Sequence, residues 1–267
     1  MGGAGLEAGE REVLAALRRR GVVCRVRRRS GALVPVTRRS QDALYSLLSH
    51  YSFRLFLRDL IRLRAGAEPQ ELTHYCSLDV VHRYLRDLEK LDLVQWRKGK
   101  ALLASQDVRS LGPTLEWYVA EVLRREFGMA ATWNLRPSKV QGGGDYDVVA
   151  LADGVLIYVE TKAAAPRNIE AGQMAAFVQR VAVLGPDMAV LVNDTQLRML
   201  DKLVPAIQRA ARTELRRIGR FRRLRGEVFV AGDCLFVTNS EPDLVGNLGL
   251  CVSHFLRSRS PLARPLG

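Results

Sequence analysis

The sequence predicts an α/β fold, a mixed β-sheet flanked by helices, with a smaller helical domain before it. Three observations predict this arrangement. Residues 41–104 show helical patterns followed by a hairpin, residues 113–194 alternate helices with apolar strands, and the net charge changes sign between these regions. We therefore expect a basic N-terminal helix and hairpin over 1–40, a helical domain over 41–111, and the α/β domain with a basic C-terminal extension over 112–267.

The composition favours a globular protein with a polyanionic partner. The 267 residues include 41 Lys+Arg and 28 Asp+Glu, which gives a net charge of +13, and 48% of them are hydrophobic. This profile excludes a disordered or collagen-like chain. The net charge is +9 over 1–111, −3 over 112–195 and +7 over 196–267. An acidic centre between basic flanks is typical of a carboxylate-bearing site beside surfaces that hold phosphates.

We expect a cytoplasmic protein that does not interact with membranes. The first residues carry Glu7, Glu10 and Glu12 and have no continuous apolar stretch, so they do not form a signal peptide. No segment reaches the roughly 18 apolar residues of a membrane span. The arginines lie on mixed polar segments without a bulky apolar face, which excludes a membrane-surface protein. The four cysteines and four histidines are scattered and give no zinc spacing.

The N-terminal region is expected to form one helix and one basic hairpin. Residues 6–20 place Val13, Leu14 and Leu17 at helical spacing before Gly21. Residues 22–26 and 32–36 are typical of two short strands. The arginines between them bind phosphate or form a solvated charged face, and both interpretations stay open.

Three helices and a hairpin are expected in the next region. Pro69 fits the first turn of a helix, and Ser77 is a suitable N-cap for the helix that follows. A basic turn that contains Gly99 separates two short strands. The predicted segments are helices over 41–64 (with a break near Tyr51), 69–75 and 78–91, and strands over 93–96 and 101–103.

The segment SLDVVHRYLRDLEKLDLVQWRKGKALLA resembles the recognition helix and wing of a winged helix-turn-helix domain. In that family the third helix enters the major groove of DNA and the wing contacts the backbone, although some members dock proteins instead. The resemblance implies DNA contacts from the exposed side of the third helix and from the wing. The residues implied are His82, Arg83, Arg86, Lys90, Arg97, Lys98 and Lys100.

The second half of the chain is dominated by a hairpin with a two-residue turn. Asp153-Gly154 is a strong signal for such a turn, so that the numbers of paired residues add up to 307. This register places Asp147 opposite Glu160, with about 5 Å between their Cβ atoms. Lys162 lies two residues beyond Glu160 and therefore on the same face.

Two opposed carboxylates on an otherwise apolar hairpin repel each other. A divalent cation between Asp147 and Glu160 would remove this repulsion, and such oxygen ligands suit Mg²⁺. Lys162 adds a positive group that can orient a water molecule or stabilise charge on a phosphate. The simpler alternative is that Glu160 and Lys162 form only a structural ion pair.

The segment GGGDYDVVALADGVLIYVETKAAAP resembles the PD-(D/E)xK nuclease superfamily, which has the restriction-endonuclease-like fold. The resemblance covers roughly residues 113–194. It implies that Asp147 and Glu160 hold Mg²⁺, or else Mn²⁺, together with the backbone carbonyl of Thr161. It also implies that Lys162 positions the attacking water.

Two further catalytic residues are implied by the same resemblance. Glu116 on the preceding helix is the better candidate for a third acid, with Glu121 as the runner-up, and Gln173 lies on the following helix. The sequence departs from the family pattern at Tyr146, which stands where a proline often precedes the first acid.

After this hairpin we expect a helix over 168–184 and a strand over 188–193 that runs parallel to the preceding strand. A helix from Gln196 to about Ile218 leads into an arginine-rich run. Beyond that run we predict a hairpin over 227–230 and 234–238 and a helix over 244–256.

The resulting hypothesis is a Mg²⁺-dependent endonuclease that hydrolyses phosphodiester bonds in double-stranded DNA. Because duplex cleavage needs two active sites, a homodimer is expected by analogy with the family. Two alternatives stay open: a catalytically inert DNA-binding regulator, and an RNA-cleaving or effector-gated defence nuclease of the same fold.

Overall fold

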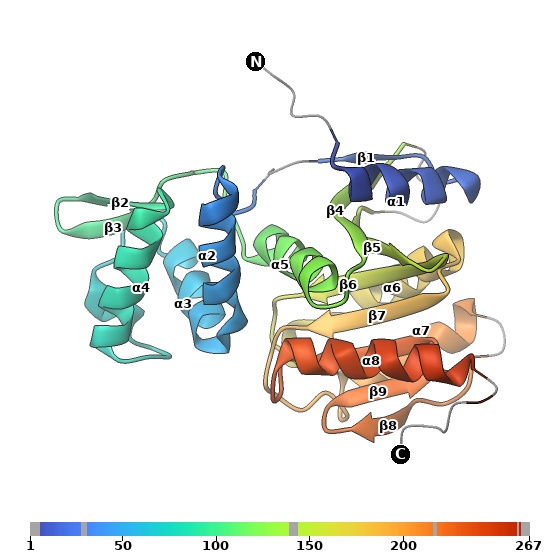
Figure 1. Cartoon of the computed structure of the whole chain (residues 1–267). Helices are drawn as coiled ribbons and strands as arrows, with labels where there is room; N and C mark the ends of the chain where they lie inside the picture. The colour runs from blue at the N-terminus through green and yellow to red at the C-terminus, as the bar shows by residue number, and fades with distance from the viewer. Residues whose placement is uncertain (1–5, 28–30, 139–143, 216–217, 261, 263–267) are drawn as a thin grey trace. The chain divides into compact units, whose positions relative to one another are not determined.

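The computed structural model describes residues 6–27, 31–138, 144–215, 218–260 and 262. The chain divides into two compact units (Figure 1). The sheet unit consists of Met1–Arg27 and Val119–Gly267, and the helical unit consists of Arg28–Tyr118. The sheet unit thus combines the start of the chain with its second half.

The sheet unit is built on eight strands in the order β1-β4-β5-β6-β7-β10-β9-β8. The central strands β6, β7 and β10 pair in parallel, and all other neighbours are antiparallel. The prediction of a mixed sheet flanked by helices is therefore confirmed. The strands are β1 (Cys24–Val26), β4 (Ala130–Pro137), β5 (Tyr146–Ala152), β6 (Val155–Lys162), β7 (Met188–Asn193), β8 (Arg222–Arg225), β9 (Val228–Ala231) and β10 (Leu235–Asn239).

Helices cover both faces of this sheet. α1 (Ala8–Arg19), α6 (Ala171–Leu184) and α7 (Leu203–Glu214) share one core with Leu156 and Tyr158 of β6. α8 (Leu244–Ser258) contacts β9 and β10 and lies on the other side of the sheet (Figure 1).

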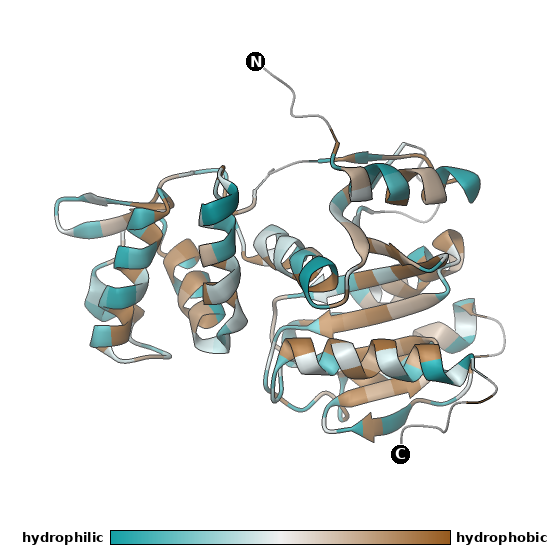
Figure 2. Ribbon diagram, viewed as in Figure 1, coloured by the Kyte–Doolittle hydropathy of each residue, from teal (hydrophilic) through white to brown (hydrophobic). Residues whose placement is uncertain are grey.

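The central strands are mostly apolar (Figure 2), and polar residues stand at the carboxyl ends of β6 and β10. Because side chains alternate along a strand, Glu160 lies on the same face as Tyr158. α6 covers that face, so the Glu160 carboxylate at the end of β6 lies between the sheet and α6.

The hairpin predicted from residues 22–26 and 32–36 is wrong. Residues 32–36 are not a strand, and β1 pairs instead with β4, with Cys24 opposite Pro137 and Val26 opposite Leu135. This pairing brings the buried Cys24 into the core that α1 shares with the sheet. A short strand pattern does not identify its partner, because a local and a distant pairing satisfy the same alternation.

The helical unit contains α2 (Arg38–Ser49), α3 (Tyr51–Arg62), α4 (Leu78–Lys90) and a hairpin of β2 (Val94–Arg97) and β3 (Lys100–Leu103). The break expected near Tyr51 lies at His50, whose backbone is extended. The helix predicted over 69–75 is a single 3-10 turn, η1 (Pro69–Leu72), with Leu72 as its only buried residue. Tyr75, three residues after Leu72, is exposed, so it does not pack a further helical turn against the unit. The assignment to the winged-helix family stays a prediction.

The C-terminal part follows the prediction except at its arginine-rich run. β9 and β10 form the predicted hairpin through Gly232 and Asp233, both at positive φ. Residues 222–225 form β8, an edge strand that the sequence did not predict, and α7 starts at Leu203, later than expected. Arg216 and Arg217 lie outside the described residues.

Two other expectations concern membrane segments and cysteines. None of the helices in the described parts of the chain has the length and apolar character needed to cross a bilayer. Cys24, Cys76, Cys234 and Cys251 are all free thiols. Cys24 and Cys251 are buried and contribute to packing, whereas Cys76 and Cys234 are partly exposed.

Candidate active site

The candidate site lies where the β5–β6 ladder ends. The paired residues run from Ala152 opposite Val155 to Val148 opposite Val159, which is the predicted register. Asp153 and Gly154 form the turn at positive φ. Asp147 is the next residue beyond the last pair of this ladder.

Asp147 interacts with the backbone of the facing strand. Its Oδ2 accepts hydrogen bonds from the Thr161 amide at 2.7 Å and from the Thr161 hydroxyl at 3.2 Å. Burial and the charge of Glu160 raise the pKa of Asp147 to about 7, against the opposing effect of Lys162. Asp147 is therefore a carboxyl group whose ionisation is costly in this environment.

Glu160 is held by three donors. Its side chain is only 1% exposed; Oε1 accepts from Lys162 Nζ at 2.5 Å and from Arg180 Nη2 at 2.6 Å, and Oε2 accepts from the Tyr158 hydroxyl. Burial alone would raise the pKa of Glu160, but Lys162 and Arg180 lower it below its usual value. Glu160 is therefore ionised and fixed in one position.

Arg180 and Tyr158 complete a closed ring around Glu160. Arg180 reaches the site from α6, and its Nε donates to the Tyr158 hydroxyl at 2.9 Å. Tyr158 in turn donates to Glu160, so that each member of the ring contacts the other two. Gly144 lies beside the Arg180 guanidinium. The ring is thus buried and supported on several sides.

Lys162 is positioned by the neighbouring strand as well as by Glu160. Its backbone carbonyl accepts from the Asp194 amide at 2.7 Å, directly after β7. The Ser240 hydroxyl donates to Asp194 Oδ1 at 2.7 Å. These contacts fix the carboxyl end of β6, where Lys162 reaches the surface of the sheet.

The donor set suits a hard divalent cation only in part. Asp147 and Glu160 supply carboxylate oxygens of the kind that Mg²⁺ prefers. The described parts of the chain contain no group of three or more His, Cys, Asp or Glu side chains that could hold a metal ion. Two carboxylates and a backbone carbonyl are a workable set, because Mg²⁺ usually keeps several water ligands. The feature that disfavours metal binding is that Glu160 already accepts hydrogen bonds from three donors.

Gln173 lies at the first turn of α6. Its Oε1 accepts from the Glu170 amide at 3.3 Å as part of a capping box, and the residue is exposed. Arg180, further along the same helix, is the residue of α6 that contacts Glu160. A role for Gln173 stays a prediction.

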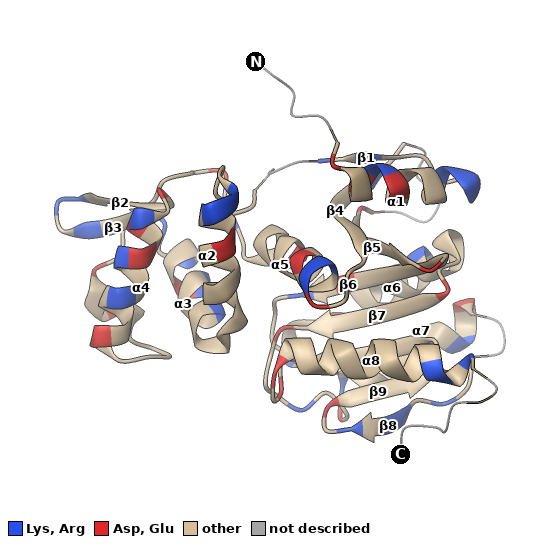
Figure 3. Cartoon of the chain, in the orientation of Figure 1, with Lys and Arg blue, Asp and Glu red and all other residues tan. Residues whose placement is uncertain are grey.

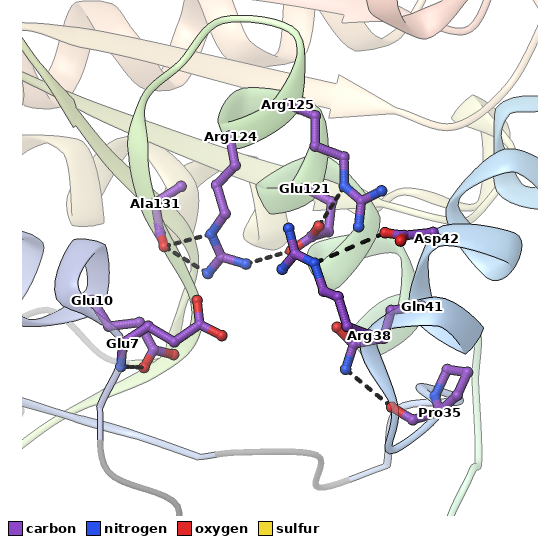
Figure 4. Close-up of polar contacts among 10 residues, drawn as sticks. All are labelled: Glu7, Glu10, Pro35, Arg38, Gln41, Asp42, Glu121, Arg124, Arg125 and Ala131. Carbon is purple, nitrogen blue, oxygen red and sulfur yellow. Dashed lines mark hydrogen bonds and ion pairs between the residues drawn. The ribbon is translucent and has the colours of Figure 1, made fainter.

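Glu121, the runner-up for a third acid, is engaged elsewhere. It is buried and binds Arg124 at 2.5 Å and Arg125 at 2.6 Å (Figure 4). Arg124 also donates to the carbonyl of Ala131 at 2.6 Å. Glu121 therefore fixes α5 (Gly112–Arg125) to β4. Glu116 belongs to the helical unit, and its predicted role stays a prediction.

Sequence reasoning did not identify Arg180 and Tyr158. Two signals were available: Tyr158 precedes Glu160 by two residues on the same strand face, and Arg180 is the only charged residue of the apolar helix AGQMAAFVQRVAVL. A single arginine on the buried face of a helix requires a buried acceptor.

The residues predicted to contact nucleic acid are all exposed. His82, Arg83, Arg86 and Lys90 are exposed on α4, and Arg97, Lys98 and Lys100 are exposed on the β2–β3 hairpin. Basic residues are coloured blue on both elements in Figure 3. Lys100 is also 3.7 Å from Glu68. Trp96, which the sequence reasoning did not single out, is 40% exposed on the same hairpin. This surface of the helical unit therefore combines positive charge with an exposed aromatic ring.

No family model and no curated protein sequence matches this chain. Several solved structures resemble it in fold, and two of them are the following. Protein VC1899 from Vibrio cholerae superposes with a TM-score of 0.53 at 16% identity, over 90% of this chain and 60% of that protein. Can2 from Sulfobacillus thermosulfidooxidans, in complex with cyclic tetra-adenylate, superposes with a TM-score of 0.52 at 14% identity, over 91% of this chain and 60% of Can2. The chain spans about 60% of the length of both, and at these identities the likeness shows a shared fold.

Proposed function

We propose that this protein is a metal-dependent nuclease that hydrolyses phosphodiester bonds in DNA. The observation that carries this proposal is that Asp147 accepts from the amide of Thr161, the residue between Glu160 and Lys162, while Lys162 Nζ lies 2.5 Å from Glu160 Oε1. A purely structural ion pair between Glu160 and Lys162 would not need a second carboxyl group nearby. Asp147 is present even though burial and the charge of Glu160 make its ionisation unfavourable. Groups with perturbed pKa values cluster at functional sites.

Each residue has a distinct role in this proposal. Asp147, Glu160 and the carbonyl of Thr161 would hold Mg²⁺, with Mn²⁺ as a substitute; the metal would offset charge on the phosphate and lower the pKa of a bound water. Lys162 Nζ lies 2.5 Å from Glu160 Oε1. Lys162 would orient the attacking water and stabilise negative charge that develops on the phosphate. Glu116 and Gln173 are proposed as supporting residues.

Plasmid cleavage with and without Mg²⁺ tests this function. We expect cleavage by the wild type that is lost in Lys162→Ala and in Asp147→Ala, with nucleic-acid binding retained. Lys202→Ala, which removes an exposed lysine of the same unit, should cleave normally. Cleavage that survives both site variants would contradict the site assignment. Complete inactivity of excess wild-type protein in Mg²⁺ would favour the inert DNA-binding regulator.

We propose that the helical unit binds double-stranded DNA through α4 and the β2–β3 hairpin. The exposed basic residues on these two elements support this proposal. We also propose a homodimer, because cutting both strands of a duplex requires two sites. Analytical ultracentrifugation of the full chain, with and without duplex DNA, tests the dimer.

A second candidate function is an effector-gated nuclease that cleaves DNA or RNA. The observation that favours it is the fold likeness to Can2, which was solved with cyclic tetra-adenylate. The test is cleavage of labelled single-stranded RNA and duplex DNA in the presence and absence of cyclic tetra-adenylate. Cleavage that depends on the cyclic nucleotide would favour this candidate, and cleavage that ignores it would favour an ungated DNA nuclease.

A further inference from the structure

The candidate site balances its charge with groups of its own. Asp147 and Glu160 bring two carboxylates, and Lys162 and Arg180 bring two cations. The sequence places Lys162 beside the two carboxylates but does not place Arg180 there, and on that basis a divalent cation is expected to relieve the carboxylate repulsion. With Arg180 in place, the protein itself offsets part of this repulsion.

Arg180 uses the oxygen atoms through which Glu160 would bind a metal. A carboxylate offers about four lone-pair positions. Lys162 and Arg180 take two positions on Oε1, and Tyr158 takes one on Oε2. A cation that approaches Glu160 meets a carboxylate that is already hydrogen-bonded through both oxygens and two positive groups beside it.

The Arg180 contact is built into the fold. The side chain is only 10% exposed, and its helix packs into the sheet core through Phe177 and Val178. Its Nε is held by Tyr158, and the position of Gly144 leaves room for the guanidinium. A surface arginine that contacts a carboxylate by chance has none of these supports.

We propose that Arg180 takes the place of a metal cation on Glu160 and thereby opposes metal binding at the site. The inference rests on the proposed function, since it concerns the metal that the nuclease would use. Losing Arg180 leaves Glu160 with one cation fewer, so the pair Asp147 and Glu160 attracts a divalent ion more strongly.

Titration of the metal-free protein with Mn²⁺, followed by electron paramagnetic resonance of the free ion, tests the proposal without measuring cleavage. Arg180→Gln should bind Mn²⁺ about tenfold or more tightly than the wild type, which corresponds to about 1.4 kcal/mol. Arg20→Gln is the matched control, because it removes the same charge from a surface pair with Asp187. Its Mn²⁺ affinity should equal that of the wild type.

Thermal melts with and without Mg²⁺ establish that each variant is folded. Metal-free Arg180→Gln should melt below the wild type, and Mg²⁺ should raise its Tm by more than it raises that of the wild type. If Arg180→Gln does not fold, Arg180→Lys takes its place: a single ammonium covers fewer positions on Glu160 and Tyr158, so tighter Mn²⁺ binding than in the wild type is again expected.

The results separate this inference from the proposed function. Equal or weaker Mn²⁺ binding by the Arg180 variant, with measurable binding by the wild type, overturns the inference and leaves the metal-dependent nuclease intact. Absence of Mn²⁺ binding in every variant, together with absence of cleavage, overturns both.

Discussion

Gly144 lies directly against the guanidinium of Arg180: a Cβ atom at Gly144 would come 2.9 Å from Arg180 Nη1. Real Cβ atoms essentially never approach another heavy atom so closely. Gly144 also has a φ of +114°, a conformation that residues with a side chain rarely adopt. Both the backbone and the space beside it therefore require glycine next to the ring of Glu160, Tyr158 and Arg180.

Gly144→Ala should weaken the Arg180–Glu160 contact and lower the Tm. The expected loss is on the order of 1–3 kcal/mol, from positive φ and from displacement of the guanidinium. Gly154→Ala is the control, because Gly154 also has positive φ but nothing lies within 4 Å of its added Cβ. Differential scanning fluorimetry measures both variants. Equal losses in the two would mean that backbone strain alone explains the effect.

Asp147→Asn should reduce the pH dependence of stability in the metal-free protein. The folded pKa of Asp147 is raised to about 7, above the usual value of about 3.9. Its contribution to stability is therefore fully present below about pH 4 and is lost as the pH rises through 7. Asparagine cannot ionise, yet its Oδ1 can still accept from the Thr161 amide.

The measurement is the Tm of both proteins at pH 6 and pH 8 in the presence of a chelator. With a folded pKa near 7, the free energy of unfolding of the wild type falls by about 1.4 kcal/mol between pH 6 and pH 8. The wild type should therefore lose roughly 3–5 °C more than Asp147→Asn. Identical pH profiles would show that the Asp147 pKa is not raised.

Glu121→Ala should destabilise the fold without changing metal affinity. The change leaves Arg124 and Arg125 without their buried carboxylate, at a cost of about 3–5 kcal/mol. The control is Asp87→Ala, which removes the acceptor of a more exposed pair with Lys90 at the same i,i+3 spacing and should cost less than about 1 kcal/mol. Urea unfolding and Mn²⁺ titration measure the two properties. A loss of Mn²⁺ binding in folded Glu121→Ala would make Glu121 a ligand.

The double variant Arg83→Ala, Arg86→Ala should bind duplex DNA more weakly and with a smaller salt dependence. Each phosphate contact that is lost should reduce the slope of log K against log salt concentration by about 1. Fluorescence anisotropy at several salt concentrations measures this slope. Arg39→Ala, an exposed arginine on α2, should bind as the wild type does. An equal loss in the control would indicate a response to net charge rather than a contact surface.

The hairpin that carries the site could be predicted from sequence because its information is local. Asp153-Gly154 fixes the turn, the turn fixes the register, and the register places Asp147 and Glu160 at the same end of the ladder. The parallel pairing of β6 and β7 followed from the intervening helix. Each of these features depends on a short stretch of chain, for which steric rules allow few backbone arrangements.

The features that could not be predicted depend on distant contacts. Arg180 is 20 residues from Glu160 in the sequence, and which helical residue faces the strand depends on the rotation of α6 over the sheet. β1 pairs with β4, which lies more than a hundred residues later in the sequence. Residues 222–225 include three arginines and lack the alternation of apolar and polar residues that predicts a strand. They nevertheless form β8, because they pair with β9 at the edge of the sheet.

The helical unit is an insertion, since the chain enters it after β1 and returns to the sheet unit within α5. Pairing β1 with β4 therefore closes a loop that contains the whole helical unit. When that unit is folded, most of the loop is already ordered, and closure costs less entropy than for a disordered loop of the same length. A substitution that unfolds residues 28–118 should therefore loosen the edge of the sheet without touching it, and hydrogen exchange at β1 would detect the change.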